Sequence, residues 1–160
     1  MIQGNHTKLR PICRGDWDQI LCWDQDNEIA RWFGKPEWDR IGRHQLSMMY
    51  AIESLDGQLI GYIGLEHISW RQKTAELRVC IGKSEFRGKG YGSDAIRTFL
   101  NHTFKNSELD QIYLRVYTEN VRAIKCYLKC GFRKEAVLYA GKRRSEDFRD
   151  MVLMTIRRAV

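Results

Sequence analysis

The feature that most constrains the fold is a glycine-rich hexapeptide, Arg87-Gly88-Lys89-Gly90-Tyr91-Gly92. It follows the alternating apolar pattern of a strand over Thr74–Gly82 and precedes the amphipathic pattern of a helix over Ser93–Phe104. Glycines let the backbone take positive φ and let a ligand approach closely. Because the first amides of a helix and its dipole attract anions, we expect an anion site here, with charge added by Arg87 and Lys89. A turn that only connects two elements is the alternative.

The loop matches neither common nucleotide-binding fingerprint. A Walker loop requires a glycine followed by Lys and then Ser or Thr, but Lys89 is followed by Gly90. A dinucleotide fingerprint requires a third glycine where this chain has Ser93, and it belongs near the start of a βαβ unit. The sequence therefore favours an anion of another kind.

A second motif lies downstream on a predicted helix. Asn120 and Tyr127 are two helical turns apart and share one face with Ala123, and Gly131-Phe132 follows. The two motifs, together with the strand before the loop, resemble the GNAT superfamily of N-acetyltransferases. The resemblance is strong over residues 70–135, and it is greatest to the branch of ribosomal-protein N-terminal and spermidine N-acetyltransferases.

The resemblance implies an α+β fold: a mixed, mostly antiparallel central sheet flanked by helices, in a single domain over residues 1–160. The order of predicted elements agrees with it. Asp16 is expected to cap a first helix, and Pro36 to begin a second one that reaches Ser47. Strands are expected over 8–13, 49–54, 59–68, 74–82, 111–117, 133–140 and 150–157, and helices over 93–104 and 120–130.

The resemblance also implies acetyl-CoA as co-substrate and no metal. The loop amides hold the pyrophosphate, three strand residues pair with the pantetheine arm as if it were another strand, and the second motif lines the path of that arm. The implied cofactor-binding residues are Val79, Cys80, Ile81, Arg87, Gly88, Lys89, Gly90, Tyr91, Gly92, Ser93, Asn120, Ala123 and Tyr127.

Two residues are expected to perform the chemistry, which is direct attack of a primary amine on the thioester within a ternary complex. In the family a tyrosine at the position of Tyr127 is the general acid that protonates the departing thiolate, whose reference pKa is ~8.5. Glu76 matches an acidic position near the acceptor amine and is expected to be the base. The alternatives are a core aromatic for Tyr127 and a surface glutamate paired with Arg78 for Glu76. His67 and His44 are the other candidate bases.

The acceptor is the least constrained part. Tryptophans and carboxylates are interleaved in the first forty residues, and such residues either form a pocket for a cationic amine or pack inward from amphipathic helices. Glu28, Trp32, Phe33 and Glu76 are the expected contacts. The acceptor is expected to be a protein N-terminus or a small amine. A polyamine such as spermidine or spermine is the alternative, weakened by Arg31 and Lys35, and a non-catalytic CoA-binding module is another.

Composition removes other classes of function. The net charge of +7 is spread along the chain, so nucleic acid is not expected as the partner. No apolar run reaches the ~18 residues of a membrane span. Five cysteines without a paired pattern indicate neither a disulfide framework nor a zinc site, and they favour the cytoplasm. A homodimer or larger homo-oligomer is expected, as in many relatives.

Overall fold

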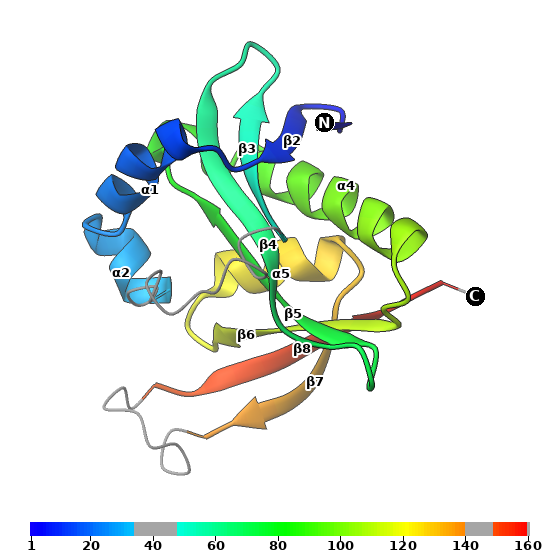
Figure 1. The fold of residues 1–160 in the computed structure, drawn as a ribbon. Helices are drawn as coiled ribbons and strands as arrows, with labels where there is room; N and C mark the ends of the chain where they lie inside the picture. Colours follow the sequence, from blue (N-terminus) through cyan, green and yellow to red (C-terminus); the bar gives the residue numbers. More distant parts are fainter. Residues whose placement is uncertain (34–47, 140–148, 160) are drawn as a thin grey trace.

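The computed structural model describes residues 1–33, 48–139 and 149–159, and these form one eight-stranded sheet with helices beside it (Figure 1). The strand order is β1-β2-β3-β4-β5-β6-β8-β7. The strands are β1 Ile2–Gln3, β2 Thr7–Pro11, β3 Met49–Ser54, β4 Leu59–Ser69, β5 Thr74–Ile81, β6 Gln111–Tyr117, β7 Arg133–Leu138 and β8 Met151–Arg157. The helices are α1 Trp17–Trp23, α2 Asn27–Phe33, α4 Tyr91–Asn106 and α5 Val121–Lys129, with short 3-10 turns η1 Arg14–Asp16 and η3 Ser84–Phe86.

Strands β5 and β6 form the one parallel pair among the described strands, and their pairing is short. It begins with Thr74 opposite Gln111 and ends with Glu76 opposite Tyr113. Beyond that point β5 stays paired only with β4, and β6 only with β8. The two strands therefore separate, and each keeps one unpaired backbone edge that faces the gap.

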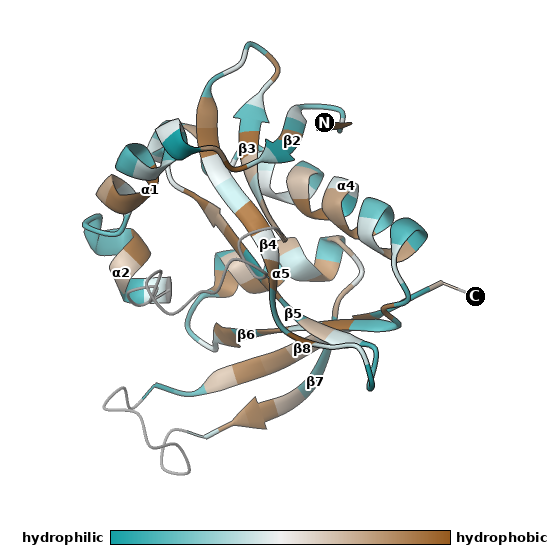
Figure 2. Cartoon of the chain, in the orientation of Figure 1, coloured by the Kyte–Doolittle hydropathy of each residue, from teal (hydrophilic) through white to brown (hydrophobic). Residues whose placement is uncertain are grey.

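Hydrophobic residues pack on both faces of the sheet. Leu77 and Val79 belong to a core formed with α4 and α5, whereas Cys80 belongs to a second cluster formed with α1 and α2. Because neighbouring strand residues point to opposite faces, the two clusters lie on opposite sides of the sheet. Figure 1 shows α1 and α2 on one side and α4 on the other, and Figure 2 shows hydrophilic residues along the outer side of α4. Ile96 and Phe99 of α4 are buried against the sheet.

The expected fold class is confirmed: the sheet is mixed, mostly antiparallel and flanked by helices. The hairpin of β3 and β4, strands β5 and β6, and helices α4 and α5 lie within a few residues of their predicted bounds. The helix predicted from Pro36 to Ser47 lies outside the described residues. No described helix is long and apolar enough to cross a membrane.

The expected capping role of Asp16 is wrong. Asp16 precedes α1, but its carboxylate makes no cap hydrogen bond to that helix. It accepts from the amide of Cys13 at 2.8 Å and pairs with both terminal nitrogens of Arg10 at 2.8 Å. The bidentate arginine fixes the carboxylate more strongly than a helix amide does. The hydrogen bond from Arg10 holds the pKa of Asp16 at about 2, below its usual range.

Candidate active site

The glycine loop presents a row of backbone donors. Gly88 and Gly90 have φ of +70° and +90°, and Gly90 is the residue before the first turn of α4. Asp94 donates the first amide hydrogen bond of the helix, to Gly90, whereas the amides from Gly88 to Ser93 donate to no backbone oxygen of the described residues. Orphan amides at the start of a sixteen-residue helix are suited to an anion such as a diphosphate.

The expected contribution of Arg87 to the anion site is wrong. Its guanidinium points back to the end of β5 and donates to the carbonyl oxygens of Ile81 and Gly82, both at 2.9 Å. It also pairs with Glu28 at 2.8 Å, and its amide donates to Ser84. Arg87 therefore connects the glycine loop to the end of β5. Lys89 is exposed and stays available to an anion.

Val79, Cys80 and Ile81 form the wall of the gap between β5 and β6. Each pairs with β4 on one side, and no described strand pairs with them on the other. That free edge can accept an extended ligand as an added strand. Burial raises the pKa of the Cys80 thiol to about 12, so this thiol is neutral near pH 7. Cys80 therefore has a free backbone edge toward the gap, and its side chain packs in the second cluster.

Helix α5 brings the second motif to the same gap. Asn120 caps the helix, because its side-chain oxygen accepts from the amide of Ala123 at 3.3 Å. Its side-chain NH₂ has no partner among the described residues. Asn120 can therefore cap α5 with its side-chain oxygen and still donate to a ligand from its side-chain NH₂.

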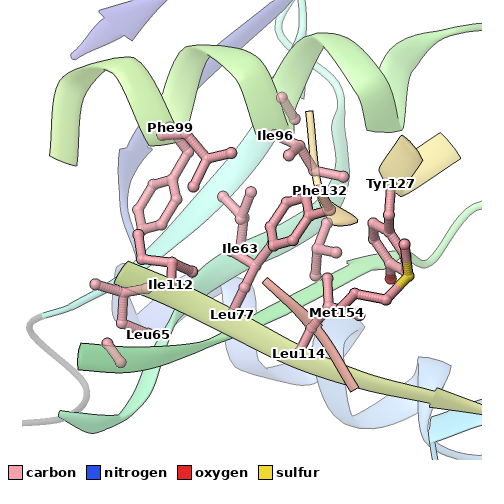
Figure 3. Close-up of a cluster of buried hydrophobic side chains, with 14 of the residues drawn as sticks. Ile63, Leu65, Leu77, Ile96, Phe99, Ile112, Leu114, Tyr127, Phe132 and Met154 are labelled. Carbon is pink, nitrogen blue, oxygen red and sulfur yellow. The ribbon is translucent and has the colours of Figure 1, made fainter. Parts of the chain in front are cut away.

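Tyr127 is a core residue with a free polar end. It is 7% exposed and its ring packs edge-on against Phe132, with the centroids 5.9 Å apart (Figure 3). None of the described residues hydrogen-bonds its hydroxyl. Burial raises the pKa of Tyr127 above its usual value, so the hydroxyl keeps its proton near neutral pH. A protonated hydroxyl without a protein partner can donate to a ligand.

A second thiol lies beside the loop. The sulfur of Cys126 on α5 is 3.3 Å from the hydroxyl of Ser93 at the start of α4. A hydrogen bond from Cys130 and another from Ser93 lower the pKa of the Cys126 thiol. Cys126 therefore places a thiol next to the predicted anion site.

Glu76 is buried and paired, but its partner is not Arg78. Its carboxylate accepts from the Nε of Arg115 at 2.8 Å and from a terminal nitrogen of the same residue at 3.1 Å. The Nδ1 of His67 lies 2.7 Å from Oε1 of Glu76, the same oxygen that accepts from the terminal nitrogen of Arg115. Arg78 pairs with Glu66 at 3.2 Å. The surface-glutamate alternative is therefore wrong, since Glu76 is only 6% exposed.

Arg115 was missed by the sequence analysis. A signal was present: along β6, Ile112, Leu114 and Val116 face the core, so Arg115 had to face the same side as Glu76. Glu66, His67 and Glu76 have ligand atoms within 4.8 Å of one another, as a metal site does. The arginines pair with both carboxylates and remove the net negative charge that a cation needs.

The expected acceptor residues lie on α2. Glu28 pairs with Arg87 at 2.8 Å and with Arg122 at 3.5 Å, so it connects α2 to the loop and to the start of α5 rather than to an open pocket. Trp32 faces β6, with its ring centroid 6.4 Å from that of Tyr117. The side chain of Phe33, together with Lys35 and His44, lies outside the described residues.

Comparison with known proteins agrees with this geometry. The model of the family described as Acetyltransferase (GNAT) domain matches residues 6–133. The chain belongs to this family. It is therefore an acetyl-CoA-dependent N-acetyltransferase, and the resemblance inferred from the two motifs is confirmed.

Several relatives have assigned acceptors. Spermidine N(1)-acetyltransferase of Vibrio cholerae is 30% identical over 140 residues, which cover 81% of this chain and 80% of the relative. Aminoglycoside N(6')-acetyltransferase type 1 of Klebsiella pneumoniae is 24% identical over 151 residues, 81% of this chain and 75% of the relative.

Solved structures are also similar. Spermidine N-acetyltransferase from Vibrio cholerae in complex with CoA and spermine superposes with a TM-score of 0.81, at 25% identity and 96% coverage of both chains. A dodecameric structure of spermidine N-acetyltransferase from the same organism gives a TM-score of 0.77 at 27% identity, over 96% of this chain and 94% of that one.

Proposed function

We propose that this enzyme acetylates a small aliphatic primary amine of the polyamine class, by direct attack in a ternary complex. The observation that supports direct attack is the position of Glu76 and Tyr127. Glu76 is the last paired residue of β5 before the gap opens, and its side chain shares a face with Cys80 and the α1–α2 side. Tyr127 belongs to the core on the opposite face of the sheet. An amine on one side and a departing thiolate on the other suit a single displacement.

The residues of the gap would hold acetyl-CoA, which supplies the activated acetyl thioester when bound. The orphan amides from Gly88 to Ser93 would bind its diphosphate, and Lys89 would add charge. The free edge of β5 from Val79 to Ile81 would pair with the pantetheine arm, and the side-chain amide of Asn120 would donate to it. These groups fit the cofactor because each is a donor or edge without another described partner.

Tyr127 would act as general acid. A CoA thiolate leaves when the amine attacks, and proton donation from the Tyr127 hydroxyl to sulfur neutralises it. The raised pKa of this tyrosine keeps the proton in place until sulfur becomes basic. At the other face, the buried Glu76 carboxylate and its hydrogen-bonded partner His67 would remove the proton of the acceptor ammonium, because only the free amine has the lone pair for attack.

The acceptor class rests on the relatives. Spermidine acetyltransferases resemble the chain over four-fifths or more of its length, and one binds spermine with CoA. The aminoglycoside relative makes an amine on a sugar the second candidate.

We further infer a homo-oligomer in a reducing compartment. Strand β7 is an edge strand whose residues are exposed, including Val137 at 46%, and Tyr139 follows it at 57%. Native proteins rarely leave such an edge uncovered, and a relative is dodecameric. All five cysteines are free, which fits the cytoplasm. Light scattering of the purified chain tests the assembly, and a monomer would contradict it.

An acceptor panel tests the main proposal. Spermidine, spermine, an aminoglycoside and a short peptide with a free N-terminus are compared by thiol release from acetyl-CoA. We expect the highest kcat/KM with a polyamine and little thiol release with the peptide. A peptide or aminoglycoside preferred by tenfold or more would refute the polyamine class. A thiol-release burst without acceptor, leaving an acetylated enzyme, would refute direct attack.

A further inference from the structure

We propose that Nε2 of His67 is the atom that takes the proton of the acceptor amine, and that Glu76 is its positioning partner. The inference deepens the proposed function and depends on it. It concerns which atom acts as base, which neither the sequence motifs nor the comparisons assign.

Glu76 is a poor proton acceptor in this arrangement. Both of its oxygens accept hydrogen bonds from Arg115, at 2.8 and 3.1 Å, and one also contacts Nδ1 of His67 at 2.7 Å. An amine that approached the carboxylate would have to displace the guanidinium or the imidazole, and the Glu76 side chain is only 8% exposed. The side chain of His67 is 60% exposed, so its far nitrogen is accessible.

The hydrogen bond to Glu76 defines the tautomer of His67. An ionised carboxylate only accepts, so Nδ1 carries the proton and Nε2 keeps its lone pair. The carboxylate then stabilises the imidazolium that forms when Nε2 takes a proton, as in other histidine–carboxylate pairs. Histidine is also the side chain whose charge changes most readily near neutral pH. Glu76 thus prepares His67 as a base.

The backbone of His67 is held in an unusual conformation. Its φ is +49°, in the left-handed region, and the register of β4 with β5 is irregular between Glu66 and Ser69. A non-glycine residue in that region costs of order 1 kcal/mol or more, and bulges of this kind redirect side chains. The irregular register lets His67 reach the carboxylate of Glu76 on the neighbouring strand.

The charged side chains around His67 carry no net charge. Glu66, Glu76, Arg78 and Arg115 form two carboxylate–arginine pairs beside it, and Tyr113 lies opposite Glu76 on β6. No excess charge from these pairs opposes formation of the imidazolium.

The reaction involves proton transfers at Nε2 of His67, at the thioester sulfur and at the acylated nitrogen. The ammonium gives its proton to Nε2 and becomes a free amine. Its lone pair forms the new C–N bond to the acetyl carbonyl carbon, the C–S bond breaks, and Tyr127 gives its proton to sulfur. The acylated nitrogen loses its second proton to water, and the Tyr127 phenolate regains a proton from solvent. The imidazolium returns its proton to solvent through the exposed side of His67, so one proton is released for each amide formed.

The test compares His67→Gln and His67→Ala with His102→Ala. Glutamine can still donate to Glu76 but cannot take a proton. His102 is a partly buried histidine of α4 whose backbone oxygen accepts from Asn106. At pH 7 we expect His67→Gln and His67→Ala to lower kcat/KM for the amine by ~100-fold or more, with an unchanged Kd for acetyl-CoA. His102→Ala should match the wild type.

Two further readouts separate a base from a structural residue. The defect should shrink as pH approaches the ~10 of a free amine, because the acceptor then loses its proton unaided. Added imidazole should restore part of the activity of His67→Ala. A wild-type rate in His67→Gln, or a defect that neither pH nor imidazole changes in both variants, would overturn the assignment. Wild-type enzyme that acetylates no polyamine would instead overturn the proposed acceptor.

Discussion

Replacing Tyr127 by phenylalanine removes one hydroxyl group and keeps the ring. The ring contact with Phe132 accounts for the packing of this residue, and it survives the change. The hydroxyl has no hydrogen-bond partner among the described residues, so its loss leaves no buried donor or acceptor unpaired. The free energy of unfolding should therefore change by less than about 1 kcal/mol.

The effect on the rate should be much larger. General acid catalysis typically contributes about 10²–10⁴-fold, or roughly 3–5 kcal/mol at 1.36 kcal/mol for each factor of ten. Because the raised pKa keeps Tyr127 protonated, the wild-type rate should not decline through loss of this proton as pH rises from ~7 to ~9. We therefore expect kcat to fall at least ~100-fold in Tyr127→Phe, with the Kd of acetyl-CoA nearly unchanged.

The assay is thiol release at saturating acetyl-CoA, with the melting temperature measured on the same samples. Tyr50→Phe is the matched control, since it removes the same group from a tyrosine of β3 whose ring packs edge-on against Phe99. A kcat within twofold of wild type, at unchanged stability, would refute the acid role of Tyr127. A large loss of stability would refute the inference that its hydroxyl has no structural partner.

Three smaller tests follow from the loop, α1 and α5. Gly90→Ala and Gly57→Ala each place a methyl group at a φ of +90° and should cost about 1 kcal/mol of stability, but only Gly90→Ala should weaken acetyl-CoA binding by calorimetry. Asp16→Asn should cost about 2 kcal/mol in urea denaturation at pH 7. Since folding lowers the Asp16 pKa, the stability from its pair with Arg10 is complete above pH ~4 and disappears as pH falls through about 2. Iodoacetamide should label Cys126 rapidly near pH 7, and acetyl-CoA should slow it in a mass-spectrometric time course.

Local signals explain what the sequence predicted correctly. Gly88 and Gly90 have positive φ, and Asn120 has the side chain of a helix cap. The loop and the cap can therefore be predicted from a few neighbouring residues. The alternation over β5 likewise separates two faces, with Leu77 and Val79 in the core of α4 and α5 and Cys80 in the cluster of α1 and α2. Local signals are enough to predict the proposed cofactor site because that site uses backbone groups at element ends.

Side-chain pairing between distant segments explains what the sequence did not reveal. The partners of Glu76 come from the irregular part of β4 and from β6, thirty-nine residues away for Arg115. Sequence proximity favoured Arg78, two residues along the strand, but the sheet register places Arg78 beside Glu66. Arg87 was misjudged for a related reason: its backbone position in the loop says nothing about which carbonyls its long side chain reaches.

One structural element, the three-residue pairing of β5 with β6, positions both halves of the site. Because it ends at Glu76 and Tyr113, the edge of β5 from Val79 onward is free for an extended ligand. The same ending places Glu76 at the closed end of the gap, with Arg115 two residues further along β6. A longer pairing would close the gap and a shorter one would separate Glu76 from Arg115. The proposed cofactor site and the proposed proton-transfer site therefore depend on the same strand register.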